Sequence, residues 1–132
     1  MISYLLDTNI VIAVLNRRSE LAIRRLAMMR DEVALPAIVM HELAFGAYNS
    51  ADPVQNLRKV HGLSLPTLNM TRADAISAGR VRAILKASGM PIGHYDLLIA
   101  GQALSRGLTL VTNNTREFAR VEGLKLEDWT AA

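Results

Sequence analysis

Apolar residues follow a pattern in which short continuous runs alternate with longer stretches of helical spacing. The runs 2–6 and 33–35 are mostly apolar, which favours strands that are buried on both faces of a sheet. Between them, Ala22, Leu26 and Met29 recur at intervals of four and three residues, as one face of a helix does. The strands predicted in this way are 2–6, 33–35, 63–68, 108–112 and 124–126.

The stretches between the strands carry start and stop signals of helices. Thr71 followed by Asp74 is close to a capping box, and Gly89 and Gly107 each end a helical stretch. A short helical turn is expected after Asn113-Asn114. The predicted helices are 8–15, 19–30, 37–48, 53–61, 71–88 and 95–105.

Strands that alternate with helices predict an α/β fold with a parallel sheet covered on both faces. Pro66 interrupts the third strand and assigns it to an edge, while 108–112 is expected to be central. In such sheets ligands bind beyond the carboxyl ends of the strands, so acidic residues at those ends are candidates for a site.

The length and composition of the chain limit the classes of protein and of site to which it can belong. A chain of 132 residues that is 51% apolar predicts one domain, 1–132, with a hydrophobic core. No apolar run reaches the roughly 18 residues that span a bilayer, and no basic region precedes the first apolar stretch. The absence of cysteine excludes disulfides, thiolate metal sites and thiol nucleophiles. These features fit a soluble cytoplasmic protein.

The net charge is +3, from 15 basic and 12 acidic residues, and all basic residues except three lysines are arginine. Arginine suits phosphate partners, so the balance permits nucleic-acid binding. A solvated helical face is the other interpretation of the arginines between the first two strands. These are Arg17, Arg18, Arg24, Arg25 and Arg30.

Four acidic residues occupy positions where acids are unexpected, and each has a structural alternative. Asp7 directly follows the first strand and can cap the next helix. Glu42 lies in an otherwise apolar helix, where it either faces a cleft or a cation, or forms a solvent-exposed stripe with His41. Asp96 opens a helix that it can cap, and Glu117 follows the strand 108–112, where it can simply be exposed.

Taken together, the four acids predict a metal site. Converging carboxylates repel one another unless a divalent cation neutralises them. Oxygen ligands without thiolates or paired histidines favour Mg²⁺ or Mn²⁺ over Zn²⁺. Metal-assisted phosphodiester hydrolysis is the chemistry that such a site supports.

Other motifs fail. His41-Glu42 begins like a zinc-binding HExxH, but the fifth position is Phe45. The segment "DTNIV" resembles the aspartyl-phosphate motif of haloacid-dehalogenase-type phosphatases. Asn9 stands where that motif has its second acid, so the general acid is missing and the phosphatase interpretation is weakly supported.

Three segments resemble the PIN-domain ribonucleases, specifically the VapC toxins of type II toxin–antitoxin systems. These are "YLLDTNIVI", "ALPAIVMHELAFGA" and the stretch from "GMPIGHYD" to "GLKLEDW", in the order of the family and over nearly the whole chain. The resemblance implies a three-layer α/β/α sandwich with a mainly parallel central sheet. It also implies an endoribonuclease that depends on Mg²⁺, with Mn²⁺ as a substitute.

The resemblance assigns the acidic residues of the family to Asp7, Glu42, Asp96 and Glu117. Asp7 and Asp96 are expected as the main metal ligands with Glu42 close by, and Glu117 is the loosest match. Four polar neighbours are expected to orient the site: Thr8, Asn9, Thr112 and Asn113.

The resemblance also implies partners. It implies a homodimer, a cognate VapB-type antitoxin, and an RNA substrate such as initiator tRNA cut in its anticodon stem-loop. The alternative function is a catalytically silent PIN-like regulator that binds RNA or a partner chain.

Overall fold

The computed structural model describes all 132 residues and contains one sheet of five parallel strands. The strand order β3-β2-β1-β4-β5 confirms the predicted parallel sheet, with β3 at an edge. The prediction that 108–112 is a central strand is confirmed, because β4 lies between β1 and β5, and β1 occupies the middle of the sheet. The strands are β1 (Tyr4–Leu6), β2 (Val33–Pro36), β3 (Thr67–Leu68), β4 (Thr109–Val111) and β5 (Lys125–Glu127).

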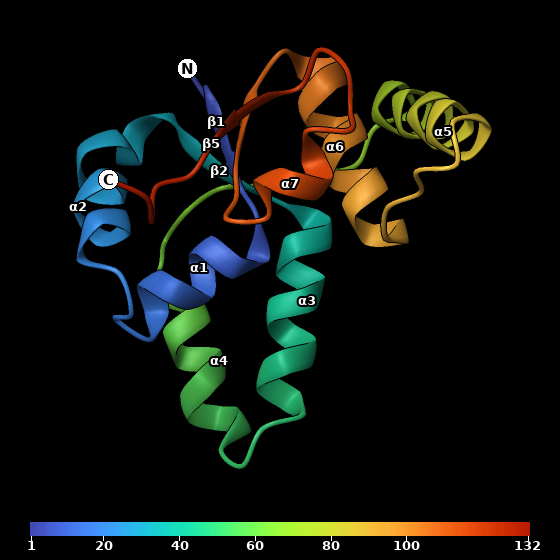
Figure 1. The fold of residues 1–132 in the computed structure, drawn as a ribbon. Coiled ribbons are helices and arrows are strands. Elements are labelled where there is room, and N and C mark those ends of the chain that lie inside the picture. The colour runs from blue at the N-terminus through green and yellow to red at the C-terminus, as the bar shows by residue number, and fades with distance from the viewer.

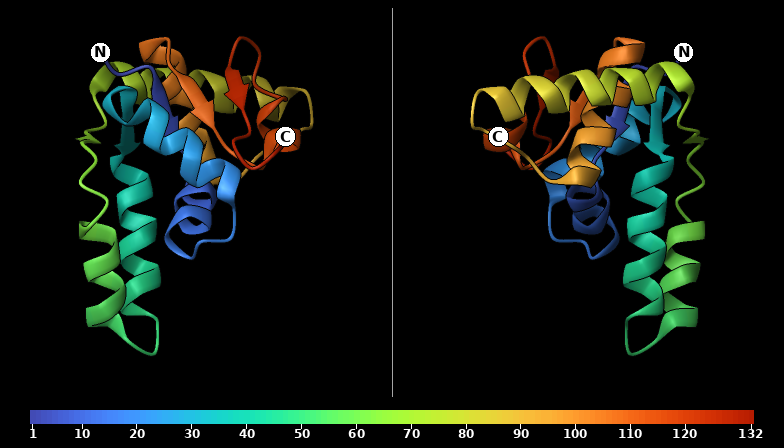
Figure 2. Two further views of the ribbon diagram at one scale, coloured as in Figure 1. Left: turned by 90° about the vertical axis from the view of Figure 1, so that its left-hand side faces the viewer. Right: turned by 90° about the vertical axis from the view of Figure 1, so that its right-hand side faces the viewer.

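Helices cover both faces of this sheet, which confirms the three-layer α/β/α sandwich. Figure 1 shows α2 and α5 on opposite sides of the strands, and the two side views in Figure 2 agree. The predicted ranges 8–15, 37–48 and 53–61 coincide with three helices. The helices are α1 (Thr8–Leu15), α2 (Glu20–Met29), α3 (Ala37–Tyr48), α4 (Pro53–His61), α5 (Arg72–Ala87), α6 (His94–Arg106) and α7 (Thr115–Phe118), with a 3₁₀ turn η1 (Arg30–Glu32).

The core lies on both faces of the sheet. Leu5 and Leu6 are consecutive in β1 and therefore point to opposite faces, yet both are fully buried. Leu110 and Val111 in β4 are fully buried in the same way. The α3–α4 hairpin, by contrast, projects away from the sheet in every view (Figures 1 and 2). None of the helices is long and apolar enough to cross a membrane.

Local signals in the sequence explain where the longer helices start and stop. Thr71 and Asp74 form the predicted capping box, with each side chain accepting from the other's backbone N–H. Gly107 ends α6 with φ +65°, a left-handed conformation that costs glycine little. Asp74 is also buried against Arg106, with a shortest N–O distance of 3.0 Å, so the start of α5 is tied to the end of α6.

The five arginines near α2 divide into two groups. Arg25 pairs with Glu127 at 3.3 Å and lies over the ring of Trp129, while Arg30 donates to the carbonyl of Leu63. The remaining three, Arg17, Arg18 and Arg24, are exposed and form no side-chain hydrogen bond or ion pair.

The strand order places a switch point between β1 and β4. The connections after β1 and β2 step toward one edge of the sheet, and the connection after β4 steps toward the other. Leu6 is paired with Val111, and the backbone N–H of Asp7 donates to the carbonyl of Val111 at 2.9 Å. The carboxyl ends of these two strands therefore meet where ligands bind in open α/β sheets.

Close packing of α5 on α6 fixes the helix that carries Asp96. A Cβ added at Gly101 of α6 would lie 2.5 Å from the backbone of Ala78 in α5. Such a separation is far inside van der Waals contact, so only glycine permits this approach of the two helices. A Cβ added at Gly79, one residue further along α5, would have nothing within 4 Å, so this second glycine offers a matched control.

We expect Gly101→Ala to lower the free energy of unfolding by about 1–3 kcal/mol, because the added methyl group overpacks the contact between the helices. Gly79→Ala should raise it by about 0.5–1 kcal/mol, because alanine favours the helix more than glycine does. Urea unfolding of the two variants measures both effects. Equal effects in the two variants would show that α5 and α6 do not pack this closely.

Candidate metal centre

Asp7 lies at the switch point and is held by three hydrogen bonds. Its Oδ1 accepts from the backbone N–H of Thr8 at 2.8 Å. Its Oδ2 accepts from the Thr112 hydroxyl at 2.8 Å and from the Asn9 amide at 3.1 Å. The residue is only 4% exposed and occupies the N-cap position of α1. Asp7 therefore starts the helix and also presents a fixed carboxylate.

Burial raises the pKa of Asp7, and the hydrogen bonds from Thr112, Thr8 and Asn9 oppose that rise. Each carboxylate oxygen can accept about two hydrogen bonds or metal contacts. Oδ2 already has two donors, whereas Oδ1 has one. Oδ1 is thus the oxygen of Asp7 that remains open to a further partner.

The predicted polar neighbours join the ends of β1 and β4. The Thr112 hydroxyl accepts from the backbone N–H of Asn114 at 2.9 Å, so its own proton is directed to Asp7. The carbonyl oxygen of the Asn9 side chain accepts from the backbone N–H of Asn113 at 3.1 Å. Residues about 100 positions apart in the sequence thereby fix one carboxylate.

Glu42 approaches the same place from α3. Its Oε1 accepts from the Thr8 hydroxyl at 3.1 Å, and the side chain is half-buried. The alternative of an exposed His41–Glu42 stripe holds only for His41, which is exposed and packs its ring against that of Tyr95 with centroids 5.5 Å apart. The prediction that Glu42 faces a cleft agrees with its position at the end of a groove.

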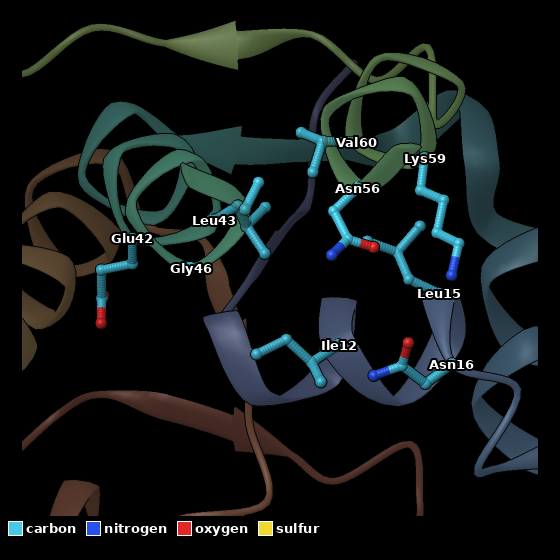
Figure 3. A pocket seen from close by; sticks show the side chains of 10 residues that line it. Ile12, Leu15, Asn16, Glu42, Leu43, Gly46, Asn56, Lys59 and Val60 are labelled. Atoms are coloured by element: carbon cyan, nitrogen blue, oxygen red, sulfur yellow. The ribbon is translucent and has the colours of Figure 1, made fainter. Parts of the chain in front are cut away.

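That groove runs between α1, α3 and α4 and has a volume of about 220 Å³. Figure 3 shows Glu42 at one end and Lys59 and Asn16 at the other, with Ile12 and Leu43 between them. Between these ends the lining is mostly apolar, with the Asn56 amide as a polar group, and only the ends carry charge.

Asp96 is the third residue of α6, and the alternative that it caps this helix is wrong. Gly93 occupies the N-cap position, and no side chain caps the helix. The pKa of Asp96 is raised to about 6 by burial and then by the charges of Asp7, Glu117 and Glu42. Three other carboxylates therefore lie near enough to Asp96 to oppose its ionisation.

Glu117 belongs to α7, which follows β4. It is half-buried rather than fully exposed, and its Oε2 accepts from the Asn114 side chain at 3.1 Å. The contribution of Asn114 was missed in the sequence, although a spacing of three residues within a helical turn is a signal that could have revealed it.

The structure thus gathers all four acids near the carboxyl ends of β1 and β4 without a basic partner. Its two ion pairs, Arg25–Glu127 and Arg106–Asp74, involve none of them. No three acidic or histidine side chains already form a closed ligand set. Unpaired carboxylates whose charges oppose one another are nevertheless the donor set that a hard divalent cation requires, so these residues fit such an ion.

Comparison with known proteins identifies the family of the chain. Residues 4–124 match the PIN domain family. The chain is 39% identical to the tRNA(fMet)-specific endonuclease VapC of Shigella flexneri, over 98% of this chain and 100% of that protein. It is 40% identical to the protein of the same name from Salmonella typhimurium, over 98% and 99% of the two chains.

Solved structures give the same result. A chain in the crystal structure of DNA-bound VapBC from Salmonella typhimurium superposes with a TM-score of 0.94 at 40% identity, covering 98% of this chain and 99% of that one. VapBC2 from Rickettsia felis, bound to a DNA fragment from its promoter, gives a TM-score of 0.91 at 34% identity, covering 98% and 99%. The chain therefore belongs to the PIN-domain family and, within it, to the VapC ribonucleases.

Proposed function

We propose that this protein is the toxin of a toxin–antitoxin pair and a Mg²⁺-dependent endoribonuclease, with Mn²⁺ as a substitute. PIN-domain nucleases in general depend on divalent metals. The observation that carries the proposal is the position of three other carboxylates near the half-buried Asp96, where burial and then their charges oppose its ionisation, in a chain that matches VapC ribonucleases over its length.

Asp7 and Asp96 would hold the cation directly, through Oδ1 of Asp7 and the carboxylate of Asp96. The negative charges of Glu42 and Glu117 would add to the attraction for the cation. When bound, the ion supplies a water of lowered pKa and stabilises negative charge on the phosphate. The protein's own part is to keep these carboxylates ionised and fixed in place.

Thr112, Thr8 and Asn9 perform that positioning. Thr112 and Asn9 hold Oδ2 of Asp7, which leaves Oδ1 directed by the start of α1. Thr8 donates its hydroxyl to Glu42 and so joins the carboxylates of Asp7 and Glu42 through one residue. Outer partners of this kind set the orientation of metal ligands.

The substrate proposed is initiator tRNA, cut in its anticodon stem-loop. The relatives from Shigella flexneri and Salmonella typhimurium carry the name tRNA(fMet)-specific endonuclease. A single-stranded loop also suits the site, because its backbone is accessible and its unstacked bases can be splayed out. Such a toxin would act in the cytoplasm, where tRNA is found.

The partner proposed is a VapB-type antitoxin, since the similar solved structures are VapBC complexes. The groove in Figure 3 is mostly apolar in its middle and has Glu42 at one end. A segment with apolar residues and a terminal Arg or Lys would fill it and place its cation among the carboxylates. A homodimer is proposed as well, on the resemblance alone.

Asp7→Asn tests the catalytic role, because asparagine keeps the shape and can still cap α1 but carries no charge. We expect RNA cleavage to fall by about 100-fold or more, since loss of even an outer partner of a metal ligand costs about 10–100-fold. Gel analysis of a labelled stem-loop with Mg²⁺ or EDTA measures it. Full cleavage by the variant, or by the wild type in EDTA, would exclude this mechanism. RNA binding without products in wild type would favour the silent regulator.

Thr112→Val tests the positioning role separately. We expect kcat to fall by about 10–100-fold with little change in KM, because the hydroxyl that holds Asp7 is lost while the shape is kept. Thr112→Ser retains the hydroxyl and should recover most of the activity. A serine variant as impaired as the valine variant would assign Thr112 a packing role only.

Asp96→Asn tests the convergence of charge through stability. The pKa of Asp96 is raised in the folded state, so the wild type is penalised as pH rises from the ordinary carboxyl pKa through about 6. Without metal, the variant should therefore melt above the wild type at pH 7, and the difference should vanish near ~pH 4, the ordinary carboxyl range. Mg²⁺ should raise the Tm of the wild type more than that of the variant. Identical melting curves under all these conditions would place the acids apart.

A further inference from the structure

A second cavity lies next to the groove of Figure 3 along α1, and the mechanism above does not use it. Its volume is about 500 Å³, against about 220 Å³ for the groove, and it falls in the range of about 300–1,000 Å³ typical of ligand sites. Five of its seven lining residues have polar side chains, namely Asn9, Arg18, Ser19, Asn113 and Thr130, and we refer to it as the Arg18 cavity.

The Arg18 cavity begins one side chain away from the metal centre. The Asn9 amide that lines it donates to Oδ2 of Asp7 at 3.1 Å, and Asn113 donates its backbone N–H to the other end of the same side chain. Ile12 lines both this cavity and the groove, so the two hollows are neighbours along α1. An RNA strand bound at the four carboxylates could therefore continue past Asn9 into this cavity.

Arg18 is the only charged residue of this cavity, and its guanidinium has no partner in the protein. Its backbone, however, is fixed. The N–H of Arg18 donates to the carbonyl of Ala13 at 2.8 Å, and that of Arg17 donates to Val14 at 3.1 Å. These two bonds form a Schellman turn at the end of α1, with Arg17 at φ +52° where glycine is usual. The turn holds Arg18 at the rim of the cavity.

The charge of the site explains why a free arginine beside it would be useful for binding RNA. Four carboxylates without a basic partner repel a polyanion, so an RNA strand needs a cation beside the site as well as within it. Arginine binds phosphate through a planar, bidentate hydrogen-bonding fork. The Thr130 hydroxyl already donates to Asp128 at 2.6 Å, whereas the Ser19 hydroxyl, which accepts from the N–H of Ala22, keeps its own proton for a ribose or a base edge.

We propose that the Arg18 cavity holds the nucleotide next to the cleaved bond, with Arg18 binding the flanking phosphate of a single-stranded RNA. This inference rests on the proposed nuclease function. It gives the direction in which the RNA substrate would run, from the carboxylates past Asn9 toward Arg18. The contact is to the backbone, so it contributes affinity for any sequence and no base preference.

Arg18→Ala tests the proposal, with Arg24→Ala as the matched control, because Arg24 is equally exposed and unpaired but does not line the cavity. We expect Arg18→Ala to raise KM for a stem-loop RNA about tenfold, the loss of one charge-assisted contact, with kcat within about twofold. The slope of log Kd against log salt should decrease in size by about 0.7, the value for one phosphate of a single strand. Arg24→Ala should change neither quantity.

Binding is also measured in the Asp7→Asn background, so that affinity is read without cleavage. Wild-type cleavage combined with equal KM and Kd for the Arg18 and Arg24 variants would overturn this inference and leave the nuclease assignment standing. Absence of cleavage combined with RNA binding that needs Arg18 would overturn the nuclease assignment and leave the cavity as an RNA site. An effect of Arg18→Ala on kcat alone would also contradict the proposal.

Discussion

Mutual repulsion among four carboxylates is the constraint on which the rest of this structure depends. Asp7, Glu42, Asp96 and Glu117 lie on or beside four different helices, and none of them is paired with a basic side chain. Keeping such charges together costs stability in the metal-free protein, and their repulsion adds to burial, the larger cause, in raising the pKa of Asp96. Hydrogen bonds from neutral donors, chiefly Thr112, Thr8, Asn9 and Asn114, hold three of the acids without cancelling their charge.

Strand pairing, hydrogen bonds and helix packing hold the acids in place against this repulsion. The carboxyl ends of β1 and β4 are joined through backbone and side-chain hydrogen bonds, which fixes Asp7 against Thr112. Asp96 is carried by α6, whose close approach to α5 depends on Gly101. Rigid strands and helices of this kind hold the carboxylates in a catalytic geometry, although their charges repel one another.

The sequence was sufficient for the periodic features. Runs of apolar residues located β1 and β2, and the bounds of α1, α3 and α4 were predicted to the residue. Strong local signals explain this success, because the Thr71–Asp74 box and Gly107 act over three or four residues. The central position of β1 was not predicted, since strand order depends on contacts between distant segments.

Within the site, the residue types were predictable and their contacts were not. The bonds from Thr8 to Glu42 and from Thr112 to Asp7 join residues 34 and 105 positions apart, and nothing local encodes them. Arg18 was grouped with the arginines of a solvated face. Its separate role depends on a turn in which Arg17 takes the place where a glycine would have marked the end of α1.

The most direct test of the account is an NMR titration of the Asp96 carboxyl carbon, with and without Mg²⁺. If the four carboxylates converge on one cation site, the metal-free pKa of Asp96 is about 6 and falls when Mg²⁺ binds. An ordinary pKa near ~3.9 that Mg²⁺ does not change would contradict that convergence and, with it, the metal centre.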